Sequence, residues 1–407
     1  MNNKLRPNRQ EMLHILQQQI KPISRYETVD VTNLAGRIAA YDIKAIHSLP
    51  NTNTAAMDGI AIRFDSLQGA AAATGTWQEG RDFVFANTGC EVAPQYDTVI
   101  KIENVSFDSN NRPLLHYLPR QKGELLHHPG TQVVQDELLA CAGEMLTPSL
   151  VGIMASGGIT TAQVLAKPRV TFIPTGDELE PIGHLPLPQG KQIDSNSLLC
   201  GAQVKEWGGE YKSTPIIADK KEAIRQAVLA AAASSDLVLI CAGSAKGTHD
   251  YTLAVLSEIG EMIVPELRHG PGKQFSLYKV NNVPVIGLPG PPHGTDLISQ
   301  LYVRPTLKLL QGQPLPQPYY VNAQLTAALD KRDMDFVVRL RLFTNNGQMM
   351  AKPINTFILT RAAAYQQMNS LYYLEKGASH NAGEIIPIEL TVAPEYIAAE
   401  GGADNGK

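Results

Sequence analysis

Apolar residues recur at helical spacing near the start of the chain. Asn8 followed by Glu11 is a capping-box pattern, in which each side chain satisfies a free backbone N–H of the first helical turn. One face of the segment then collects the apolar side chains Met12, Leu13, Leu16 and Ile20. The spacing predicts a helix over residues 8–21 that packs by this face.

The stretch from residue 51 to residue 135 breaks into short apolar runs separated by glycine-containing segments. Phe83–Ala86 and Thr98–Ile102 are two such runs, and both are short enough to be strands. This stretch predicts a small β-rich domain. The pattern becomes helical again over Leu146–Ala155, around Pro148.

From Arg169 onward, predicted strands and helices alternate. The predicted strands are Val170–Ile173, Thr214–Ala218, Leu237–Cys241 and Val283–Leu288, and the predicted helices are Ser197–Trp207, Glu222–Ala233, Tyr251–Ile259 and Thr295–Leu310. Such alternation predicts a doubly wound, mostly parallel sheet, whose ligands sit at the carboxyl ends of the strands. That rule directs attention to the turns that begin at Thr175, Ala242 and Pro289.

The length of 407 residues predicts several domains. Pro314, Pro316 and Pro318 form a stiff linker, after which runs such as Phe336–Leu342 and Ile385–Leu390 predict a final β-domain. We expect an α/β multidomain protein. Its predicted parts are an N-terminal helical and β domain (residues 1–50 with 136–168), a β-rich insert (51–135), the α/β domain (169–312), a C-terminal β-domain (316–398) and a disordered tail (399–407).

Composition narrows the class of protein. A hydrophobic content of 43%, a charged content of 18% and a net charge of -4 are ordinary for a globular protein and give no global attraction to nucleic acid or to an anionic membrane. The polar start, Met1–Arg9, lacks the apolar core of a signal peptide, and no apolar run is long enough to span a bilayer. We therefore expect a cytoplasmic location. The four cysteines form no CxxC pair and are expected to be buried, reduced thiols.

Two segments of the β-rich stretch offer polar groups beside small residues. Ala55-Ala56-Met57-Asp58-Gly59 places a carboxylate next to a backbone that a ligand can approach closely, although Asp-Gly is also ordinary turn chemistry. Thr88-Gly89 offers a hydroxyl in a second turn of the same kind. Either segment can be a plain loop.

Three segments of the α/β domain follow strands. Pro174-Thr175-Gly176-Asp177-Glu178-Leu179 presents two acids that could cap a helix or coordinate a hard cation such as magnesium, and Asp194 could cap the next helix. The turn from Ala242 to Asp250 contains Gly243, Ser244 and Lys246, which suit a phosphate, although it matches neither a Walker motif nor a dinucleotide fingerprint. The turns Gly270–Lys273 and Gly287–Pro292 could likewise hold an anion or be turns only.

Taken together and in order, these segments resemble the MoeA family, the molybdopterin molybdenumtransferases, over about residues 7–395. The family's S-A-M-D-G-Y-A stands here as residues 55–61, its T-G-D-E-L is intact at residues 175–179, and its G-L-P-G-x-P is intact at residues 287–292. The resemblance implies a MogA-like α/β domain, a four-domain homodimer and a site between the third domain and the second domain of the partner. It also implies possible contacts with other proteins of the pathway.

The resemblance implies the following roles. Asp58, Glu178 and Asp250 would be catalytic, and the same acids with Asp219 would hold Mg²⁺. The ligand, adenylylated molybdopterin with molybdate, would be bound by Thr88, Thr175, Gly176, Asp219, Gly243, Ser244, Lys246, Lys273, Pro289 and Gly290. The metal ion would polarise the phosphoanhydride, and insertion of molybdate would release AMP.

Several positions depart from the family pattern. Pro129-Gly130-Thr131 replaces an acidic turn, residues 242–247 lose a glycine of the family's turn, and Thr360-Arg361-Ala362-Ala363 replaces a serine-rich stretch. Glu266 and Gly270 stand where the family has lysines, although Arg268 and His269 are expected to compensate. Three hypotheses follow: an active molybdenum insertase, a non-catalytic pterin-nucleotide-binding paralogue that acts as scaffold or regulator, and a nucleotidyltransferase of the same pathway.

Overall fold

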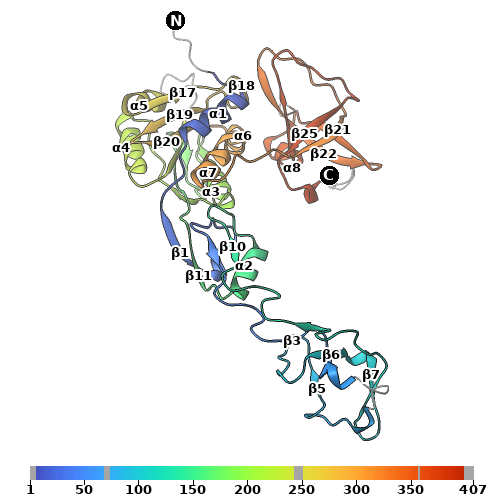
Figure 1. Cartoon of the computed structure of the whole chain (residues 1–407). Coiled ribbons are helices and arrows are strands. Elements are labelled where there is room, and N and C mark those ends of the chain that lie inside the picture. The colour runs from blue at the N-terminus through green and yellow to red at the C-terminus, as the bar shows by residue number, and fades with distance from the viewer. Residues whose placement is uncertain (1–5, 68–73, 243–250, 356–357, 398–407) are drawn as a thin grey trace. The chain divides into compact units, whose positions relative to one another are not determined.

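The structure is a computed structural model that describes residues 6–67, 74–242, 251–355 and 358–397. The chain folds into two compact units (Figure 1). Unit 1 comprises Met1–Ser24 and Ala166–Lys407, and unit 2 comprises Arg25–Leu165. Each unit is described by itself below.

Unit 1 contains a six-stranded sheet with the order β15-β12-β16-β20-β19-β17. The four strands from β15 to β20 run parallel, and β19 and β17 add an antiparallel edge, so the predicted mostly parallel sheet is confirmed. The strands are β12 (Arg169–Ile173), β15 (Glu210–Ser213), β16 (Leu237–Ala242), β17 (Glu261–Val264), β19 (Ser276–Val280) and β20 (Val283–Pro289). A separate two-stranded pair contains β13 (Leu179–Glu180) and β14 (Gln192–Ile193).

Helices cover both faces of this sheet (Figure 1). Val170 and Phe172 of β12 face one core, and Ile173 faces the other, because successive side chains of a strand point to opposite faces. The first core is covered by α1 (Arg9–Gln19), α3 (Asn196–Glu206), α6 (Pro292–Ile298) and α7 (Arg304–Leu310), and the second by α4 (Lys221–Ala232) and α5 (Tyr251–Ile259). The predicted double winding is therefore confirmed.

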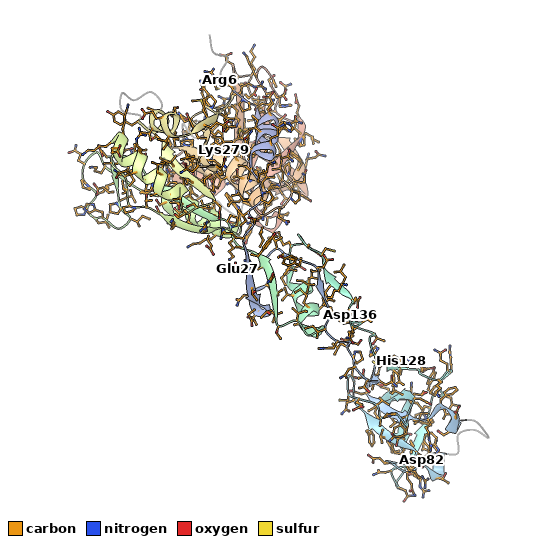
Figure 2. All side chains as sticks on the ribbon, turned by 60° about the vertical axis from the view of Figure 1, so that its left-hand side comes forward. Arg6, Glu27, Asp82, His128, Asp136 and Lys279 are labelled. Carbon is orange, nitrogen blue, oxygen red and sulfur yellow. The ribbon has the colours of Figure 1, made fainter. Side chains whose placement is uncertain are left out.

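The N-terminal helix belongs to unit 1, whereas the sequence grouped it with residues up to 50. The capping box between Asn8 and Glu11 is confirmed, and Met12 and Leu16 are fully buried against the sheet. Lys279 of β19 fixes the far end of the helix by donating a hydrogen bond to Gln19 Oε1 at 2.9 Å (Figure 2).

Two predicted elements of unit 1 were wrong in detail. The strand expected at Thr214–Ala218 is β15, which ends at Ser213, because Pro215 has no N–H to donate to a neighbouring strand. The single helix expected at Thr295–Leu310 begins at Pro292 and is interrupted by a π-helical segment, η5 (Ser299–Val303). Pro305 follows at the start of α7, where its ring and missing N–H disturb the regular pattern of helical hydrogen bonds.

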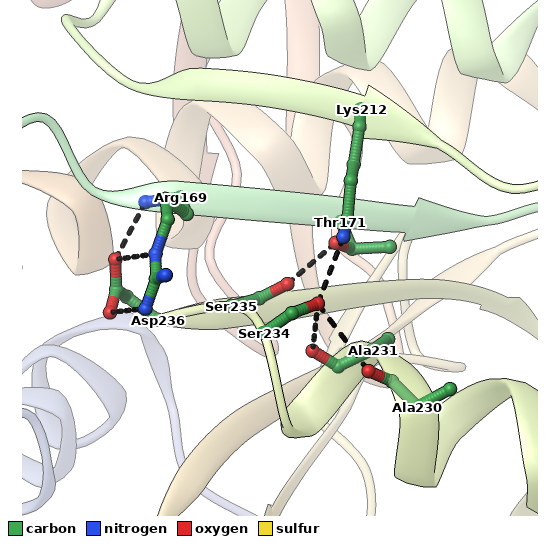
Figure 3. Close-up of polar contacts among 8 residues, drawn as sticks. All are labelled: Arg169, Thr171, Lys212, Ala230, Ala231, Ser234, Ser235 and Asp236. Atoms are coloured by element: carbon green, nitrogen blue, oxygen red, sulfur yellow. Dashed lines mark hydrogen bonds and ion pairs between the residues drawn. The ribbon is translucent and has the colours of Figure 1, made fainter.

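Polar contacts fasten the amino ends of the central strands (Figure 3). The backbone N–H of Arg169 donates to Asp236 Oδ2 at 2.7 Å, and the hydroxyls of Thr171 and Ser235 lie 2.5 Å apart. Lys212 Nζ donates to Ser234 Oγ at 2.9 Å, at the turn that follows α4. These groups satisfy one another, which leaves the opposite, carboxyl edge as the place for a ligand.

The C-terminal part of unit 1 is a closed β-barrel. Its strands pair in the ring β22-β23-β21-β25-β24, and β24 closes onto β22. They are β21 (Tyr320–Leu325), β22 (Asp335–Asn345), β23 (Gln348–Pro353), β24 (Ser370–Leu374) and β25 (Ile385–Leu390), with the helix α8 (Arg361–Gln367) and the short turn η6 (Pro394–Tyr396). The predicted runs at Phe336–Leu342 and Ile385–Leu390 are confirmed as strands.

Three charge pairs and one strand pairing join the barrel to the α/β domain. Arg9 pairs with Glu389, Arg268 Nε lies 2.8 Å from Asp335 Oδ2, and Arg339 Nη1 lies 3.5 Å from Asp296 Oδ2. The short strand β18 (His269–Gly270) runs parallel to the start of β22. The loops between the two parts are thereby held against each other.

Unit 2 contains small sheets around three cores. Its elements are β1 (Tyr26–Asp30), η1 (Val31–Asn33), β2 (Ile43–Lys44), β3 (Thr54–Ala55), β4 (Gly59–Ile62), η2 (Phe64–Leu67), η3 (Thr74–Thr76), β5 (Phe83–Ala86), β6 (Thr98–Lys101), η4 (Ile102–Asn104), β7 (Val105–Phe107), β8 (Pro113–Leu115), β9 (Leu126–His127), β10 (Leu138–Ala140), α2 (Pro148–Ser156) and β11 (Thr161–Leu165). The predicted strands at residues 83–86 and 98–102 and the helix near Pro148 are confirmed. The finer division of the chain into domains stays a prediction.

The cysteine prediction was half wrong. Cys200 and Cys241 are buried, and burial raises the pKa of the Cys241 thiol to about 12. Cys90 and Cys141 are exposed, because both lie in loops of unit 2. All four are free thiols. Among the described residues, no helix combines the length and the apolar character that a membrane span requires.

Candidate functional site

Asp58 and Thr88 meet in unit 2, at the ends of β4 and β5. The backbone N–H of Thr88 donates to Asp58 Oδ1 at 2.7 Å, and the Thr88 hydroxyl donates to the same oxygen at 2.8 Å. The hydrogen bond from the Thr88 backbone, with that from its hydroxyl, lowers the pKa of Asp58. The exposed carboxylate is therefore ionised and oriented.

Gly59 follows Asp58 because the chain passes close to β6 at this point. A Cβ at Gly59 would lie 1.9 Å from the carbonyl oxygen of Ile100, which no side chain can do. The glycine of the Ala55–Gly59 segment therefore has a packing reason, and the carboxylate beside it is the group available to a ligand.

In unit 1, the segment Pro174–Glu178 leaves the carboxyl end of β12. The Thr175 hydroxyl is buried and donates to the carbonyl of Cys241 on the neighbouring strand β16, so it fixes the turn and is not free for a ligand. Gly176 has φ +144°, a conformation that favours glycine. The backbone, rather than the threonine side chain, is what this turn presents at the edge of the sheet.

Asp177 and Glu178, the two acids of this segment, make different contacts. Neither caps a helix, since the short strand β13 follows. Asp177 and Asp219 join two loops by reciprocal hydrogen bonds, from Asp177 N to Asp219 Oδ2 at 3.3 Å and from Asp219 N to Asp177 Oδ1 at 3.2 Å. Glu178 is exposed, and among the described residues its carboxylate has no hydrogen bond or ion pair. Of the two acids in this segment, Glu178 is therefore the one that is open to a cation or a ligand.

The turn after β20 leaves the same edge of the sheet, with β16 between β20 and β12. Asn196 Nδ2 donates to the carbonyl of Gly290 at 2.8 Å, and the Thr295 hydroxyl donates to the carbonyl of Pro289. Only Gly290 and His293 of residues 289–293 have an N–H, because the other three are prolines. The turn is rigid, but it offers fewer N–H donors than an anion-binding loop of ordinary composition. Asp194 lies one residue before Ser195, the N-cap of α3, and its Oδ1 accepts a hydrogen bond from Ser197 N at 3.0 Å.

Four predicted site residues lie outside the described residues. They are Gly243, Ser244, Lys246 and Asp250 of the turn after β16. The end of β16 is adjacent to β12 and β20 in the sheet. The chain therefore enters this turn from the same edge that carries Thr175 and Pro289.

The lysine turn, Gly270–Lys273, is electrically balanced. Lys273 Nζ lies 3.7 Å from Glu266 Oε2, and Arg6 pairs with the other oxygen of the same carboxylate (Figure 2). A cavity of about 530 Å³ opens beside these groups and also contains Asp333, Asp335 and Glu375. Of the cations that line it, Arg6, Arg268 and Lys273 are each paired with a carboxylate, and Lys376 is the fourth.

The expected compensation by Arg268 and His269 was wrong. Arg268 is bound to Asp335, whose hydrogen bond raises the pKa of the guanidinium. His269 is fully buried, its Nε2 lies 2.6 Å from the hydroxyl of Tyr302, and burial lowers its pKa to about 4. A neutral, buried imidazole adds no charge to an anion site. Both side chains hold the barrel against the α/β domain instead.

A second cavity of unit 1, which we call the arginine cavity, was missed by the sequence analysis. It has a volume of about 630 Å³ and is lined by Pro271, His293, Arg332, Phe336, Arg339, Asn355, Arg361 and Tyr365, with aliphatic residues of the barrel. Arg361 has no ion pair among the described residues, and Arg332 lies 4.0 Å above the ring of Phe336. The sequence has four arginines between residues 332 and 361, which was the available signal, but only the barrel topology brings three of them to this cavity.

The described residues contain no group of three or more His, Cys, Asp or Glu side chains that could by itself hold a metal ion. Glu178 and Asp219 lie on adjacent loops of unit 1, and Asp58 lies in unit 2. With the described side chains alone, a cation at the sheet edge would thus need oxygen atoms from a ligand as well.

Comparisons with known proteins agree with this architecture. Residues 8–158 match the family described as "MoeA N-terminal region (domain I and II)", and residues 171–309 match the family described as "Probable molybdopterin binding domain". The two matches cover unit 2 with the N-terminal helix and the α/β domain of unit 1, in the family's order.

Full-length relatives extend the match. The chain is 27% identical to the molybdopterin molybdenumtransferase of Haemophilus influenzae over 89% of this chain and 93% of that protein, and 24% identical to that of Bacillus subtilis over 89% of each. A molybdopterin biosynthesis MoeA protein of Pyrococcus horikoshii superposes with a TM-score of 0.78 at 25% identity, covering 96% of this chain and all of that one.

The fold defines a multidomain α/β protein built around a MogA-like domain and a C-terminal β-barrel. The order of its segments, both family matches and the full-length structural similarity identify it further. The chain belongs to the MoeA family.

Proposed function

We propose that this protein inserts molybdate into adenylylated molybdopterin and releases AMP, in molybdenum cofactor biosynthesis. The names of the curated relatives support the reaction class. The observation that carries the proposal is the turn at Pro289–His293, which joins a sheet edge with a free carboxylate to a cavity lined by arginines. A ligand that contains both a phosphoanhydride and an oxyanion needs these two kinds of environment side by side.

The residues at the sheet edge fit Mg²⁺ in the form it takes with nucleotides. Magnesium is commonly held by one or two carboxylates together with phosphate oxygens and water, so a complete protein cage is not required. Glu178 and Asp219 would hold the ion in unit 1, and Asp58 stays a proposed ligand from unit 2. When bound, Mg²⁺ would screen the charge of the pyrophosphate.

The chain's own groups act by position and charge. The backbone of Thr175 and Gly176 would form one wall of the nucleotide site, and the rigid Pro289–Gly290 turn would form another. Arg361 and Arg332 would hold the molybdate substrate, because guanidinium groups donate several hydrogen bonds to tetrahedral oxyanions. No side chain of the described edge is placed as a covalent nucleophile.

An AMP-release assay tests the proposal. Purified protein with adenylylated molybdopterin, molybdate and Mg²⁺ should release AMP, and Glu178→Gln should reduce the rate by about a hundredfold. Glu210→Gln, an exposed acid at the start of β15 and at the opposite edge of the sheet, is the matched control and should keep the wild-type rate. A folded but fully inactive wild-type protein would reject the proposal.

A second candidate is a pterin-nucleotide-binding paralogue without turnover, acting as scaffold or regulator. The observation in its favour is the neutralised lysine turn, in which Glu266 binds both Arg6 and Lys273. Calorimetry that detects binding of the pterin nucleotide, together with no AMP release under any metal condition, would support this candidate against the first.

The family resemblance also supports a homodimer. Light scattering on the purified full chain should give twice the mass of 44.2 kDa.

Asp58→Asn should reduce AMP release strongly without unfolding unit 2, because the carboxylate is exposed and its removal leaves no buried charge.

A further inference from the structure

His293 occupies an unusual place in the arginine cavity. It is the second residue of α6 and directly follows the rigid turn after β20. Its backbone carbonyl accepts a hydrogen bond from Arg339, which fixes the histidine relative to the barrel. Its imidazole lines the cavity together with Arg361, Tyr365 and Asn355. Nothing in the fold therefore requires a histidine side chain at this position.

The two ring nitrogens of His293 differ in their surroundings, and this difference indicates which of them faces the cavity. Nδ1 is buried and has no hydrogen-bond partner, whereas Nε2 is not among the buried side-chain atoms that lack a partner. A buried N–H without a partner is more costly than a buried lone pair without one. The neutral ring is thus expected to carry its proton on Nε2, which leaves an N–H donor open to whatever occupies the cavity.

The charges that face this ring favour an anion. Arg339 from β22 is paired with Asp296 of α6, at 3.5 Å, but Arg361 of α8 is free among the described residues. From the loop before β22, Arg332 and Asp330 line the same cavity, and Tyr365 adds a hydroxyl from α8. Against these, the acids are Asp296, which is already paired, and the exposed Asp330. The cavity keeps an excess of positive charge.

We propose that His293 is a ligand-binding residue of the arginine cavity, which donates from Nε2 to a doubly charged tetrahedral oxyanion and makes its binding tighter as the pH falls. The inference rests on the proposed function, because molybdate is the oxyanion that this reaction consumes. It assigns the histidine a role that the reaction itself does not require.

The direction of the pH effect follows from the surroundings. Burial, with the charges of Arg361 and Arg339, lowers the pKa of His293 in the empty cavity. A dianion placed against Nε2 reverses the sign of the local field and raises that pKa. Because the ring is then protonated at a higher pH in the complex than in the free protein, binding takes up a proton. Affinity therefore rises as the pH falls through the pKa of the complex and levels off below that of the free protein.

Calorimetric titration of the full chain with sodium molybdate and, separately, with sodium sulfate tests this inference. Sulfate remains a dianion throughout the range from pH 8 to pH 6, so its pH dependence reports the protein. Wild-type affinity should rise by up to about tenfold for each pH unit within the titration window. His293→Gln keeps an N–H donor but does not titrate, and its affinity should be independent of pH. His14→Gln, an exposed histidine of the same unit, should retain the wild-type slope.

The outcomes separate the two proposals. If the wild-type protein binds neither anion at any pH, the oxyanion site of the proposed function fails, and this inference fails with it. If the wild-type protein binds but His293→Gln retains the same pH slope, only the role of His293 is overturned. Nitrogen-15 NMR of the wild-type histidines gives a readout that does not depend on a variant. The ring of His293 should carry its proton on Nε2, and its titration should move to higher pH when sulfate is added. Protonation of this ring on Nδ1, or a titration that sulfate does not move, contradicts the inference.

Discussion

The lysine turn and the arginine cavity are both basic regions of unit 1, but their charges are arranged differently. Around the lysine turn, Lys273 and Arg6 share Glu266, and Arg268 is bound to Asp335. In the arginine cavity, Arg339 is paired, whereas Arg361 is free among the described residues. The number of basic residues is therefore a poor guide to anion binding. What counts is how many of them lack a carboxylate.

Each region also contains one histidine, His269 fully buried and His293 half-buried, and the two differ in the same way. His269 has a hydroxyl partner on Nε2 and no exposure, so it belongs to the packing of the barrel. His293 lines a cavity, and its ring Nδ1 has no hydrogen-bond partner in the part of the chain that the structure describes. The comparison assigns structure to the first region and ligand binding to the second, and four substitutions test that assignment.

The largest effect should come from Arg339, because it is the one arginine of the cavity with a structural role. Its side chain and that of Asp296 are each only 10% exposed, so Arg339→Ala leaves a buried carboxylate without its cation, although the amides of Gln203 and Gln300 still donate to it. Such a loss costs about 3 kcal/mol of unfolding free energy or more. Urea denaturation measures it, with Lys273→Ala, an exposed pair, as the control that should change little. Equal stability of both variants would remove the distinction between Arg339 and the exposed cations.

The next effect concerns His269 and acid. Burial lowers its pKa from 6.5 to about 4, so the folded state keeps the ring neutral while the unfolded state takes up a proton below pH 6.5. Stability is therefore lost as the pH falls, by about 2 kcal/mol between pH 7.5 and pH 5. The His269→Gln variant can still bond to Tyr302, but its free energy of unfolding should lack this part of the pH dependence. Denaturation at several pH values measures it. An unchanged slope would show that His269 is accessible to protons and that the lysine turn is open.

The sequence located the sheet and its carboxyl edge because both depend on local patterns. Alternating strands and helices with apolar cores predicted the doubly wound domain, and the residues after β12 and β20 were found through their position at the carboxyl ends of strands. Spacing alone also identified Glu178, which the structure leaves open, but it could not show that Thr175 and Asp177 are used by neighbouring loops. Those contacts join residues 42 or more positions apart.

The arginine cavity was beyond sequence reasoning for the same reason. Arg332, Arg361 and His293 come from the loop before β22, the helix α8 and the start of α6, and they converge only when the barrel closes. The error over Arg268 and His269 has a related origin. Proximity in sequence to the lysine turn suggested compensation, but Arg268 is bound to Asp335 of β22, and His269 of β18 is paired with the same strand. Charge compensation in this chain is a property of the tertiary fold.

Arg361 provides the third test of the comparison, through affinity rather than stability. Arg361→Ala should weaken molybdate binding by about tenfold, because one charge-assisted hydrogen bond is lost from an accessible site. Lys273→Ala should change the affinity less than Arg361→Ala does, since Glu266 already neutralises that lysine. Calorimetry at a single pH is sufficient. The reverse order of effects would place the oxyanion at the lysine turn.

The smallest effect should come from substitution of Glu266. It tests whether this carboxylate alone prevents the lysine turn from binding an anion. Glu266→Gln keeps the shape of the side chain and removes the charge that binds Arg6 and Lys273. Because these cations are half exposed, their release should strengthen molybdate binding by about two- to fivefold at low salt, and the gain should fade as the ionic strength rises. In the Arg361→Ala background, the same substitution should give the same factor if the two regions act independently. A larger factor in that background would mean that both regions hold one anion. The lysine turn and the arginine cavity would then be two walls of a single site.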